Sequence, residues 1–468
     1  MLATTNSPNT VLQTVPPVGA QIDYRYFMNC VHCGLCTSAC PTYLETGNEN
    51  DSPRGRIYLM RNVVDGRMEL TDSVKHHLEL CLDCRACETA CPSGVQYGRL
   101  IEPFRVEMQQ RELAGGDSQA NGWFQKFILY GLFPYANRLR WALAPARWAQ
   151  RLGLDRLTDG LGVTRLLPKQ LQRMQALLPK LPSPTPRLPE VLSPVGKRRA
   201  RVALFTGCVA DAMFGPTNWA TARVLQYNGC EVVVPRGQVC CGAIHYHSGA
   251  GEPALQLAQQ NAAVFNVDDV DAVIINVAGC GSMLKDYGHV AHELAPVGHV
   301  SNVPSQHEHV GNVLHEQLVK FAHKVQDVSE FLISLGPIKP TGEIKLRATY
   351  HDACHLCHAQ KIREQPRDLL SLVPGLELIP LAESEICCGA AGSYNLTQPE
   401  MAAQLGRRKL ENILKTNAQA VITGNAGCSL QLQMQLRQAG HDIWVAHPMD
   451  VLDLSYRQQQ PACLRGTM

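Results

Sequence analysis

The pattern of apolar and polar positions along the chain changes near residue 195. Before it, apolar residues recur at helical spacing, as in segment 52–60. Pro53 stands at the position that proline favours in the first turn of a helix, so this segment predicts a helix start. After residue 195, short apolar runs alternate with helical stretches, which is typical of an α/β arrangement.

A proline-rich stretch separates the two patterns. Residues 179–194 contain six prolines and are followed by Lys197, Arg198 and Arg199. Such a composition predicts a linker that is followed by a solvent-exposed basic segment. We therefore expect a domain boundary near residue 195.

The apolar runs beyond this linker predict buried strands joined by helices. Helical stretches are expected from Pro216 and over about 253–266. The expected strands cover residues 201–208, 230–235, 272–280, 346–354, 376–380 and 420–428.

Cysteines follow these predicted strands in two matching sets. The first set is Cys208, Cys240, Cys241 and Cys280, and the second is Cys354, Cys387, Cys388 and Cys428. From the first cysteine to the pair, and from the pair to the last cysteine, the steps are 32 and 40 residues in one set and 33 and 41 in the other. Because the carboxyl ends of parallel strands line the ligand crevice of an α/β sheet, we expect two quasi-equivalent halves that each present four thiols there.

Two further cysteine runs lie in the helical part. Both read C-x2-C-x2-C-x3-C-P, and they are formed by Cys30, Cys33, Cys36 and Cys40 and by Cys81, Cys84, Cys87 and Cys91. At this spacing three thiolates bind one iron-sulfur cluster, and the fourth cysteine binds the cluster of the other run. We predict two [4Fe-4S] clusters, one held by Cys30, Cys33, Cys36 and Cys91 and the other by Cys81, Cys84, Cys87 and Cys40.

Zinc and disulfides are weaker interpretations of these cysteines. A structural zinc site usually takes two separated C-x2-C pairs, which gives no reason for the longer run to occur twice. A disulfide framework is typical of short secreted chains, whereas this chain has 19 cysteines in 468 residues.

Composition narrows the class of protein further. The 43 Lys and Arg residues nearly balance the 41 Asp and Glu residues, so nucleic-acid binding is not expected. The first twenty residues lack the basic and apolar regions of a secretory signal, and no apolar run approaches the ~20 residues needed to span a bilayer. Thiolate ligands then favour a cytoplasmic location.

The segment over residues 123–150 mixes aromatic and basic side chains without acidic ones. Such a segment suits peripheral contact with the cytoplasmic membrane, and it equally suits a connecting helix packed on the cluster domain or on a partner. We expect a flexible leader over 1–20, a helical cluster domain over 21–115, an amphipathic and Pro-rich connector over 116–195, and two α/β domains over 196–340 and 341–468.

Several other residues invite interpretation. Arg54, Arg56, Arg61 and Arg67 are candidates to offset anionic clusters, with a solvated helix face as the alternative for the last two. His351, His355 and Cys357 are either further ligands, a proton relay near a quinone, or hydrogen-bonding residues of the strand-end loop. Cys230 is expected to be a packed thiol, Cys463 a tail residue, and the histidine-rich stretch 289–323 an insertion loop.

The twin cysteine run combined with two C…CCG…C repeats resembles the iron-sulfur subunit of bacterial glycolate oxidase (glycolate dehydrogenase), in the wider group of CCG-domain and heterodisulfide-reductase-like proteins. The likeness covers about residues 24–455. Local strings similar to that family lie at 53–59, 91–95, 221–225, 240–243 and 387–392.

This resemblance implies an α+β multidomain chain in which a helical 2x[4Fe-4S] ferredoxin-type domain precedes two repeated α/β CCG domains. It also implies flavin-binding partner subunits that oxidise glycolate to glyoxylate, while this non-flavin subunit of the oxidoreductase passes electrons toward a membrane quinone or another acceptor. The lack of a dinucleotide-binding glycine motif agrees with a flavin located elsewhere.

Three alternatives remain at this stage. The first is the iron-sulfur subunit of a lactate or other 2-hydroxy-acid dehydrogenase, and the second is a metal-stabilised scaffold. The third is a disulfide-reducing enzyme of the heterodisulfide-reductase branch, which is disfavoured because Met283 and Gln431 stand where that branch has a fifth cysteine. Each CCG set is expected to hold a further cluster, a zinc ion or no metal.

Overall fold

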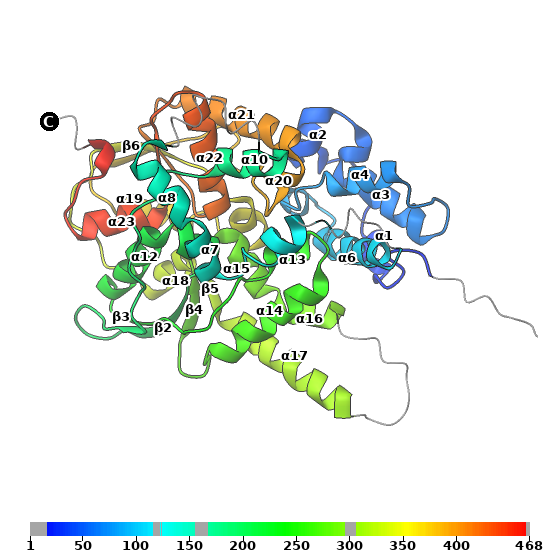
Figure 1. The fold of residues 1–468 in the computed structure, drawn as a ribbon, viewed down its shortest axis with the longest axis horizontal. Helices are drawn as coiled ribbons and strands as arrows, with labels where there is room; N and C mark the ends of the chain where they lie inside the picture. The colour runs from blue at the N-terminus through cyan, green and yellow to red at the C-terminus, as the bar shows by residue number, and fades with distance from the viewer. Residues whose placement is uncertain (1–15, 116–121, 123, 155–166, 295–305, 465–468) are drawn as a thin grey trace, which may run out of the picture.

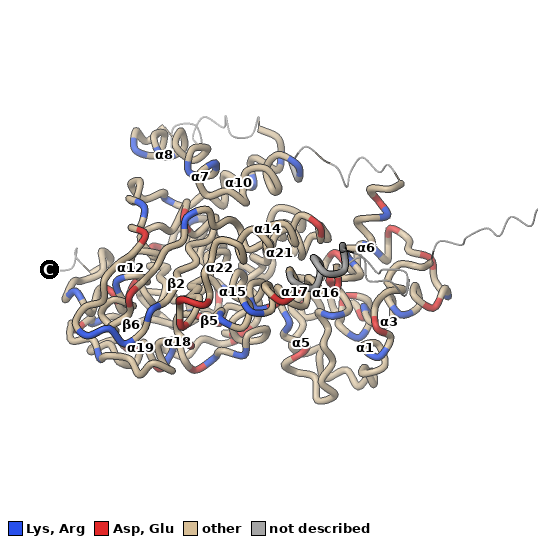
Figure 2. The backbone as a smooth tube through the Cα atoms, turned by 90° about the horizontal axis from the view of Figure 1, so that it is seen from below, with Lys and Arg blue, Asp and Glu red and all other residues tan. Residues whose placement is uncertain are grey.

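The computed structural model describes residues 16–115, 122, 124–154, 167–294 and 306–464. Figure 1 shows a helical N-terminal domain beside two α/β domains that pack against each other. In the view of Figure 2, the connector helices form a layer over the α/β domains. This arrangement agrees with the predicted fold class, a helical cluster domain followed by two repeated α/β domains.

The N-terminal domain is built from short helices around one apolar core. The helices are α1 (Arg25–Met28), α2 (Pro41–Thr46), α3 (Pro53–Val64), α4 (Asp72–Glu79), α5 (Ala86–Thr89) and α6 (Gly98–Ala114). Helix α3 begins at Pro53 as expected, because the Ser52 side chain caps it by accepting a hydrogen bond from the Gly55 N–H at 3.0 Å. Phe27, Met60 and Phe104 are fully buried in the core.

The predicted leader is partly folded. Residues 1–15 lie outside the described part of the chain. Val18 is buried in the N-terminal core, and the Gly19 N–H donates a hydrogen bond to Glu107 Oε2 at 2.8 Å. Residues 16–20 therefore belong to the folded domain, which corrects the expected extent of a flexible leader.

The connector consists of short helical pieces. They are a π-helical segment (Phe124–Leu129), α7 (Ala136–Ala142), α8 (Ala144–Arg151) and α10 (Lys169–Leu177). Leu139 and Leu143 are buried against Ala212 and Met213 of the first α/β domain. The connector therefore packs on the α/β part rather than on the cluster domain alone.

The first α/β domain contains a five-stranded sheet in the order β1-β3-β2-β4-β5. Its strands are β1 (Val191–Leu192), β2 (Ala200–Phe205), β3 (Cys230–Val233), β4 (Ala272–Ile275) and β5 (Val325–Asp327). All neighbours are parallel except β1 and β3, and β2 pairs with β4 in the register Val202↔Ala272. The helices are α11 (Val209–Met213), α12 (Gly215–Tyr227), α13 (Ala243–His247), α14 (Gly251–Val264), α15 (Ala278–Lys285), α16 (Tyr287–Leu294), α17 (Gln306–Lys324) and α18 (Val328–Leu335).

The second α/β domain repeats this plan with a four-stranded parallel sheet in the order β7-β6-β8-β9. Its strands are β6 (Leu346–Tyr350), β7 (Leu376–Ile379), β8 (Ala420–Ile422) and β9 (Trp444–Ala446). Its helices are α19 (Gln365–Ser371), α20 (Tyr394–Thr397), α21 (Pro399–Lys415), α22 (Ala426–Gln438) and α23 (Pro448–Tyr456). In both sheets the first strand of the repeat lies between the next two, so the repeat in sequence is also a repeat in topology.

The two sheets share one apolar core. Leu204 and Ile274 of the first sheet lie in the same buried group as Ala348 and Ile422 of the second. Helices α12 and α23 also pack against each other, and Arg223 binds Asp453 through two hydrogen bonds of 2.7 Å. Shared burial of this kind holds the two cysteine-bearing strand edges at a fixed separation.

Two local expectations were wrong. Several predicted strands end before their cysteines: β2 stops at Phe205, and Cys280 lies inside helix α15. The apolar runs continue into the following helices, so periodicity alone does not mark where each strand ends. The histidine-rich stretch is also not a loop where the structure describes it, since α16 and α17 cover that part, and residues 295–305 lie outside the described chain.

None of the helices in the described part of the chain combines the length and the apolar character that a bilayer crossing demands.

Candidate metal centres

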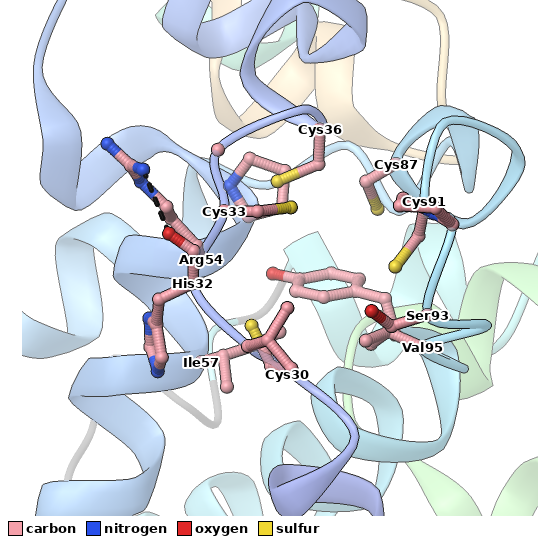
Figure 3. Close-up of a pocket in the computed structure, with 15 residues that line it drawn as sticks. Cys30, His32, Cys33, Cys36, Arg54, Ile57, Cys87, Cys91, Ser93 and Val95 are labelled. Atoms are coloured by element: carbon pink, nitrogen blue, oxygen red, sulfur yellow. Dashed lines mark hydrogen bonds between the residues drawn. The ribbon is translucent and has the colours of Figure 1, made fainter.

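The first cysteine run forms a hollow together with one cysteine of the second run. Cys30, Cys33, Cys36 and Cys91 line it (Figure 3). Cys87 reaches the same hollow from the helix that follows the second loop. Cys91 is therefore separated from the other three residues in sequence but adjacent to them in space.

A neighbouring hollow contains the remaining cysteines of the two runs. Cys40, Cys81, Cys84 and Cys87 line it. Cys40 belongs to the first run and faces the thiols of the second, as the spacing predicts. The structure thus brings together both of the expected groups of four, and Cys87 lines both hollows.

The two cysteine loops have the same backbone conformation. His32 and Asp83, which occupy equivalent positions in the loops, both adopt φ of 53°. Gly34 and Arg85, two residues further on, have φ of 85° and 61°. Left-handed residues are costly away from glycine, so their recurrence in both loops indicates a backbone constrained to wrap around a common object.

The donor set suits a metal cluster. Burial raises the pKa of Cys36 to about 11, and burial also raises the pKa values of Cys84 and Cys87 well above their ordinary range. Buried thiols of this kind become thiolate ligands only when a nearby cation compensates their charge, which iron provides. Each hollow offers at least four cysteine sulfurs, the number that a [4Fe-4S] cluster requires.

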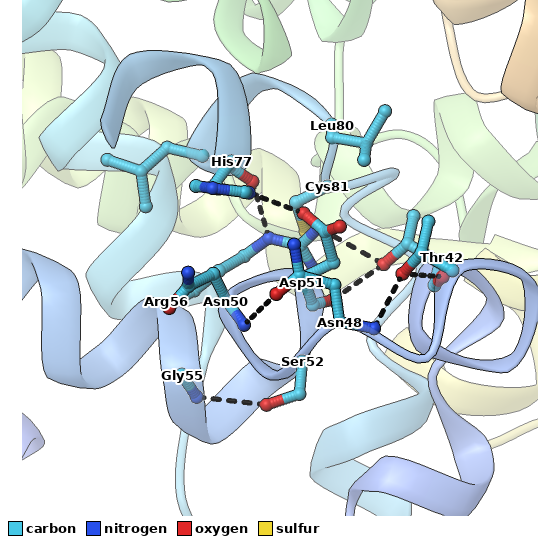
Figure 4. A network of polar contacts seen from close by, with 12 residues as sticks. Thr42, Asn48, Asn50, Asp51, Ser52, Gly55, Arg56, His77, Leu80 and Cys81 are labelled. Atoms are coloured by element: carbon cyan, nitrogen blue, oxygen red, sulfur yellow. Dashed lines mark hydrogen bonds and ion pairs between the residues drawn. The ribbon is translucent and has the colours of Figure 1, made fainter. Parts of the chain in front are cut away.

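Arg56 is buried beside the second hollow in a polar network (Figure 4). Its side chain donates hydrogen bonds to the Thr42 hydroxyl at 3.1 Å and to the His77 carbonyl at 2.6 Å. It also lies 3.7 Å from Asp51 and 4.0 Å from the Cys40 sulfur. A fixed cation at this position offsets negative charge on thiolates.

The other three candidate arginines differ in position. Arg54 lines the first hollow, where it binds Glu49 and donates to the His32 carbonyl. Arg61 and Arg67 both pair with Asp65 instead. Of the four arginines, Arg54 and Arg56 therefore stand at the cysteine hollows, and the other two do not.

The two CCG sets gather at the carboxyl edges of their sheets. In the second set the sulfurs of Cys354 and Cys387 lie 3.9 Å apart. The glycine after each cysteine pair has a positive φ, 89° at Gly242 and 87° at Gly389. A Cβ on Gly389 would lie 2.7 Å from the Ala402 carbonyl oxygen, so the close packing of the backbone requires the glycine of the CCG motif.

One cavity of about 510 Å³ joins the two CCG sets. All eight cysteines line it: Cys208, Cys240, Cys241, Cys280, Cys354, Cys387, Cys388 and Cys428. Connector residues, among them Leu139, Leu143 and Met174, line it as well. The sequence predicts the thiols but gives no sign that the connector covers them.

His351 faces the second CCG set. Its Nδ1 donates to the Ser384 carbonyl at 3.0 Å, which leaves Nε2 as the acceptor nitrogen. His351, Cys388 and Cys428 place ligand atoms within 4.8 Å of one another, and Nε2 has no hydrogen-bond partner among the described residues. A histidine fixed through Nδ1 with a free Nε2 is the usual form of a metal-binding imidazole.

A buried charged cluster links the N-terminal domain to the first CCG domain. Arg85 binds Asp83 at 2.8 Å and Glu102 at 2.7 Å, and His247 of helix α13 lies within 3.1 Å of both carboxylates. Burial would lower the pKa of His247, but hydrogen bonds to Asp83 and Glu102 and their charges raise it to about 9. The sequence gives no indication of this cluster, because His247 lies far from the other three residues in the chain.

The remaining candidate residues are described by their burial or exposure. Cys230 is buried in β3, where burial raises its pKa to about 12, whereas Cys463 is exposed. Cys357 is buried next to the second set, and burial lowers the pKa of His355 to about 4. Gln431, at one position of the absent fifth cysteine, is buried and donates to the Ala402 carbonyl.

Three family descriptions match the chain. Residues 27–95 match a 4Fe-4S dicluster domain, and residues 202–285 and 348–433 each match a cysteine-rich domain. Residues 120–178 match the linker region of the glycolate oxidase iron-sulfur subunit. The dicluster match implies two [4Fe-4S] clusters in the N-terminal domain, in agreement with the predicted cofactors.

Several known proteins are similar over most of the chain. The probable glycolate oxidase iron-sulfur subunit of Bacillus subtilis is 38% identical over 90% of this chain and 91% of that protein. The glycolate oxidase iron-sulfur subunit of Escherichia coli is 31% identical over 92% and 94% of the two chains. A CoM/CoB fumarate reductase subunit of Methanothermobacter marburgensis is 28% identical over 95% of this chain and 75% of its own length.

Proposed function

The chain belongs to the family of glycolate oxidase iron-sulfur subunits, and from this premise we propose that it carries electrons from a flavin-bearing partner to a membrane quinone. The partner subunits oxidise glycolate to glyoxylate at the flavin. This chain would receive the electrons at the thiol sites that its described residues provide.

The observation that carries this proposal is a continuous series of thiol groups through the protein. The first hollow adjoins the second through Cys87, which lines both. Cys84 of the second hollow packs in one buried group with Cys354 and Cys387 of the second CCG set. A structural scaffold does not need thiol groups in a continuous series, whereas electron transfer depends on closely spaced redox sites.

The proposed ligands follow from the two hollows. Cys30, Cys33, Cys36 and Cys91 would hold one [4Fe-4S] cluster, and Cys81, Cys84, Cys87 and Cys40 would hold the other. When bound, such clusters accept and release single electrons, so the flavin converts the two-electron oxidation into single steps. Arg54 and Arg56 supply positive charge beside the two hollows.

The CCG sets are proposed to bind metal as well. Each set brings four thiols to one cavity, and His351 offers the second set an imidazole nitrogen. A disulfide-cleaving reaction is not favoured, because Met283 and Gln431 are buried packing residues where a fifth thiol would stand.

We also propose that the complex lies on the cytoplasmic face of the membrane as a peripheral assembly. Trp141 and Trp148 of the connector are exposed, at 81% and 64%. Aromatic rings flanked by basic residues suit the headgroup region of a bilayer. This contact would place the electron acceptor within the reach of the chain.

The proposal is tested on the complex purified anaerobically with its flavin subunits. Addition of glycolate should reduce the flavin and then produce the paramagnetic resonance signals of reduced clusters. Reduced flavin with clusters that stay oxidised would indicate a scaffold. Faster reduction by lactate than by glycolate would instead favour the alternative of another 2-hydroxy-acid dehydrogenase.

A further inference from the structure

The cavity between the CCG sets is lined by apolar connector side chains as well as by the thiols. Its volume is about 510 Å³, which lies in the range of small-molecule sites. Apolar side chains of the connector form the wall opposite the cysteines. Those residues are Leu132, Phe133, Leu139, Leu143, Met174, Leu177 and Leu178.

The charge of the cavity wall limits what it can bind. Its lining contains no lysine, arginine, aspartate or glutamate among the described residues, and the His247 imidazolium that lines it is already paired with Asp83 and Glu102. A nucleotide, a phosphate ester or a carboxylate would therefore enter without a cationic partner that is not already paired, at a large cost in desolvation. The polar groups near the thiols include His247, His355 and Asn425, which can donate hydrogen bonds to a neutral carbonyl.

The opposite side of the same connector helices faces solvent with a different composition. Phe127, Trp141 and Trp148 are exposed there, and so are Lys126, Arg138, Arg151 and Lys169. Residues 124–154 and 167–178 include no acidic side chain. Figure 2 shows α7, α8 and α10 as an outer layer on the α/β domains. This layer separates the cavity from a surface suited to anionic lipid headgroups.

We propose that this cavity binds the ring of an isoprenoid quinone, which enters from the bilayer past the connector helices. The inference rests on the proposed function and specifies where its acceptor binds. A neutral ring with an apolar tail matches the apolar connector wall, and metal centres held by the thiol sets would place the electron source against the ring. The outer aromatic and basic surface holds the opening at the membrane, where the quinone resides.

The reaction balances with groups already named. Glycolate gives up two electrons and two protons as it becomes glyoxylate, and the electrons pass to this chain through the flavin. Metal centres held by the CCG thiols would supply two electrons to the quinone, which would take two protons from water, so that both carbonyl oxygens become hydroxyls. Quinol then leaves by the same apolar route.

The test fills the cavity from the connector side. Ala146→Trp on α8 and Met174→Trp on α10 place a large ring in the cavity, whereas Ile338→Trp, at an exposed position away from it, is the matched control. Each variant is assayed in the complete complex with glycolate and either a short-chain quinone or a soluble dye. We expect the KM for the quinone to rise about tenfold or more in both cavity variants. Dye reduction and the control should stay at the wild-type level.

A second measurement on the wild-type complex does not depend on the folding of any variant. A photoactivatable short-chain azidoquinone should label connector or CCG residues of the cavity, and unlabelled quinone should compete. Unchanged quinone kinetics in both cavity variants, or labelling confined to a partner subunit, would overturn the assignment. If wild-type complex reduces neither dye nor quinone with glycolate, the proposed function itself fails, which is a separate outcome.

Discussion

His247 Nδ1 lies 3.1 Å from Asp83 Oδ2, and this contact ties the first CCG domain to the loop that carries Cys81 and Cys84. Glu102 lies 3.0 Å from the same nitrogen. The imidazolium thus joins two buried carboxylates across a domain boundary. Its charge state should affect how firmly the cluster domain is attached.

The first prediction is a loss of stability at high pH that depends on His247. Its pKa is raised from 6.5 to about 9 in the folded chain, so the charged form stabilises the fold fully below pH 6.5 and loses this effect as the pH rises through 9. The shift corresponds to a stabilisation on the order of 3 kcal/mol. The thermal midpoint of His247→Gln should therefore be well below that of the wild type at pH 6.5, and the gap should shrink by pH 9.5.

The matched control for this experiment is His441→Gln, since His441 is exposed. That variant should follow the wild type at every pH. A gap between His247→Gln and the wild type that stays constant from pH 6.5 to 9.5 would contradict the role assigned to the imidazolium.

The second prediction concerns metal content. Protein purified anaerobically should contain at least about eight irons per chain, because the N-terminal domain holds two cubes of four. Metal occupancy of the CCG sets would add to this number. Elemental analysis that finds about four irons together with zinc would count against two clusters.

The third prediction concerns the crossed ligands. Cys40→Ser should remove or alter the cluster held mainly by Cys81, Cys84 and Cys87, because Cys40 lines their hollow. The iron content should fall by up to about four. Paramagnetic resonance of the reduced protein distinguishes the two clusters, with the exposed Cys463→Ser as control. Damage limited to the cluster of Cys30, Cys33 and Cys36 would refute the crossed assignment.

The fourth prediction concerns the second CCG set. Cys388→Ser should abolish or strongly slow reduction of the quinone by glycolate, because Cys388 lies in the cavity and places its sulfur near His351. Cys230→Ser, a buried cysteine outside the cavity, controls for general loss of packing. A Cys388→Ser complex that assembles and reduces quinone at the normal rate would leave this set as a structural element.

Much of the architecture follows from local sequence. The twin run places Cys91 with the first loop and Cys40 with the second, since the spacing restricts which thiols can reach one cluster. The matching steps between the CCG cysteines predict two quasi-equivalent halves, and the two sheets do repeat one strand order. Each of these features depends on residue spacing within a short segment or on a repeat. Both can be read directly from a single sequence.

The rest depends on contacts between distant segments. Nothing near Asp83, Glu102 or His247 in the sequence indicates that they meet, because their association requires the docked domains. The ends of β2 and β4 were also misplaced, since an apolar run does not distinguish a buried strand from the buried helix after it. The connector offered an amphipathic pattern, but the pattern did not identify the cavity beneath it.

The central claim is that electrons from glycolate must pass through this chain. The most direct measurement is rapid-mixing absorbance spectroscopy of the complete complex with Cys84→Ser, in which flavin bleaching and quinone reduction are followed together. We predict that glycolate still bleaches the flavin at the wild-type rate, because that chemistry belongs to the partner, while quinone reduction is lost. Quinone reduction at the wild-type rate in Cys84→Ser, with Cys463→Ser as the matched control, would contradict the claim.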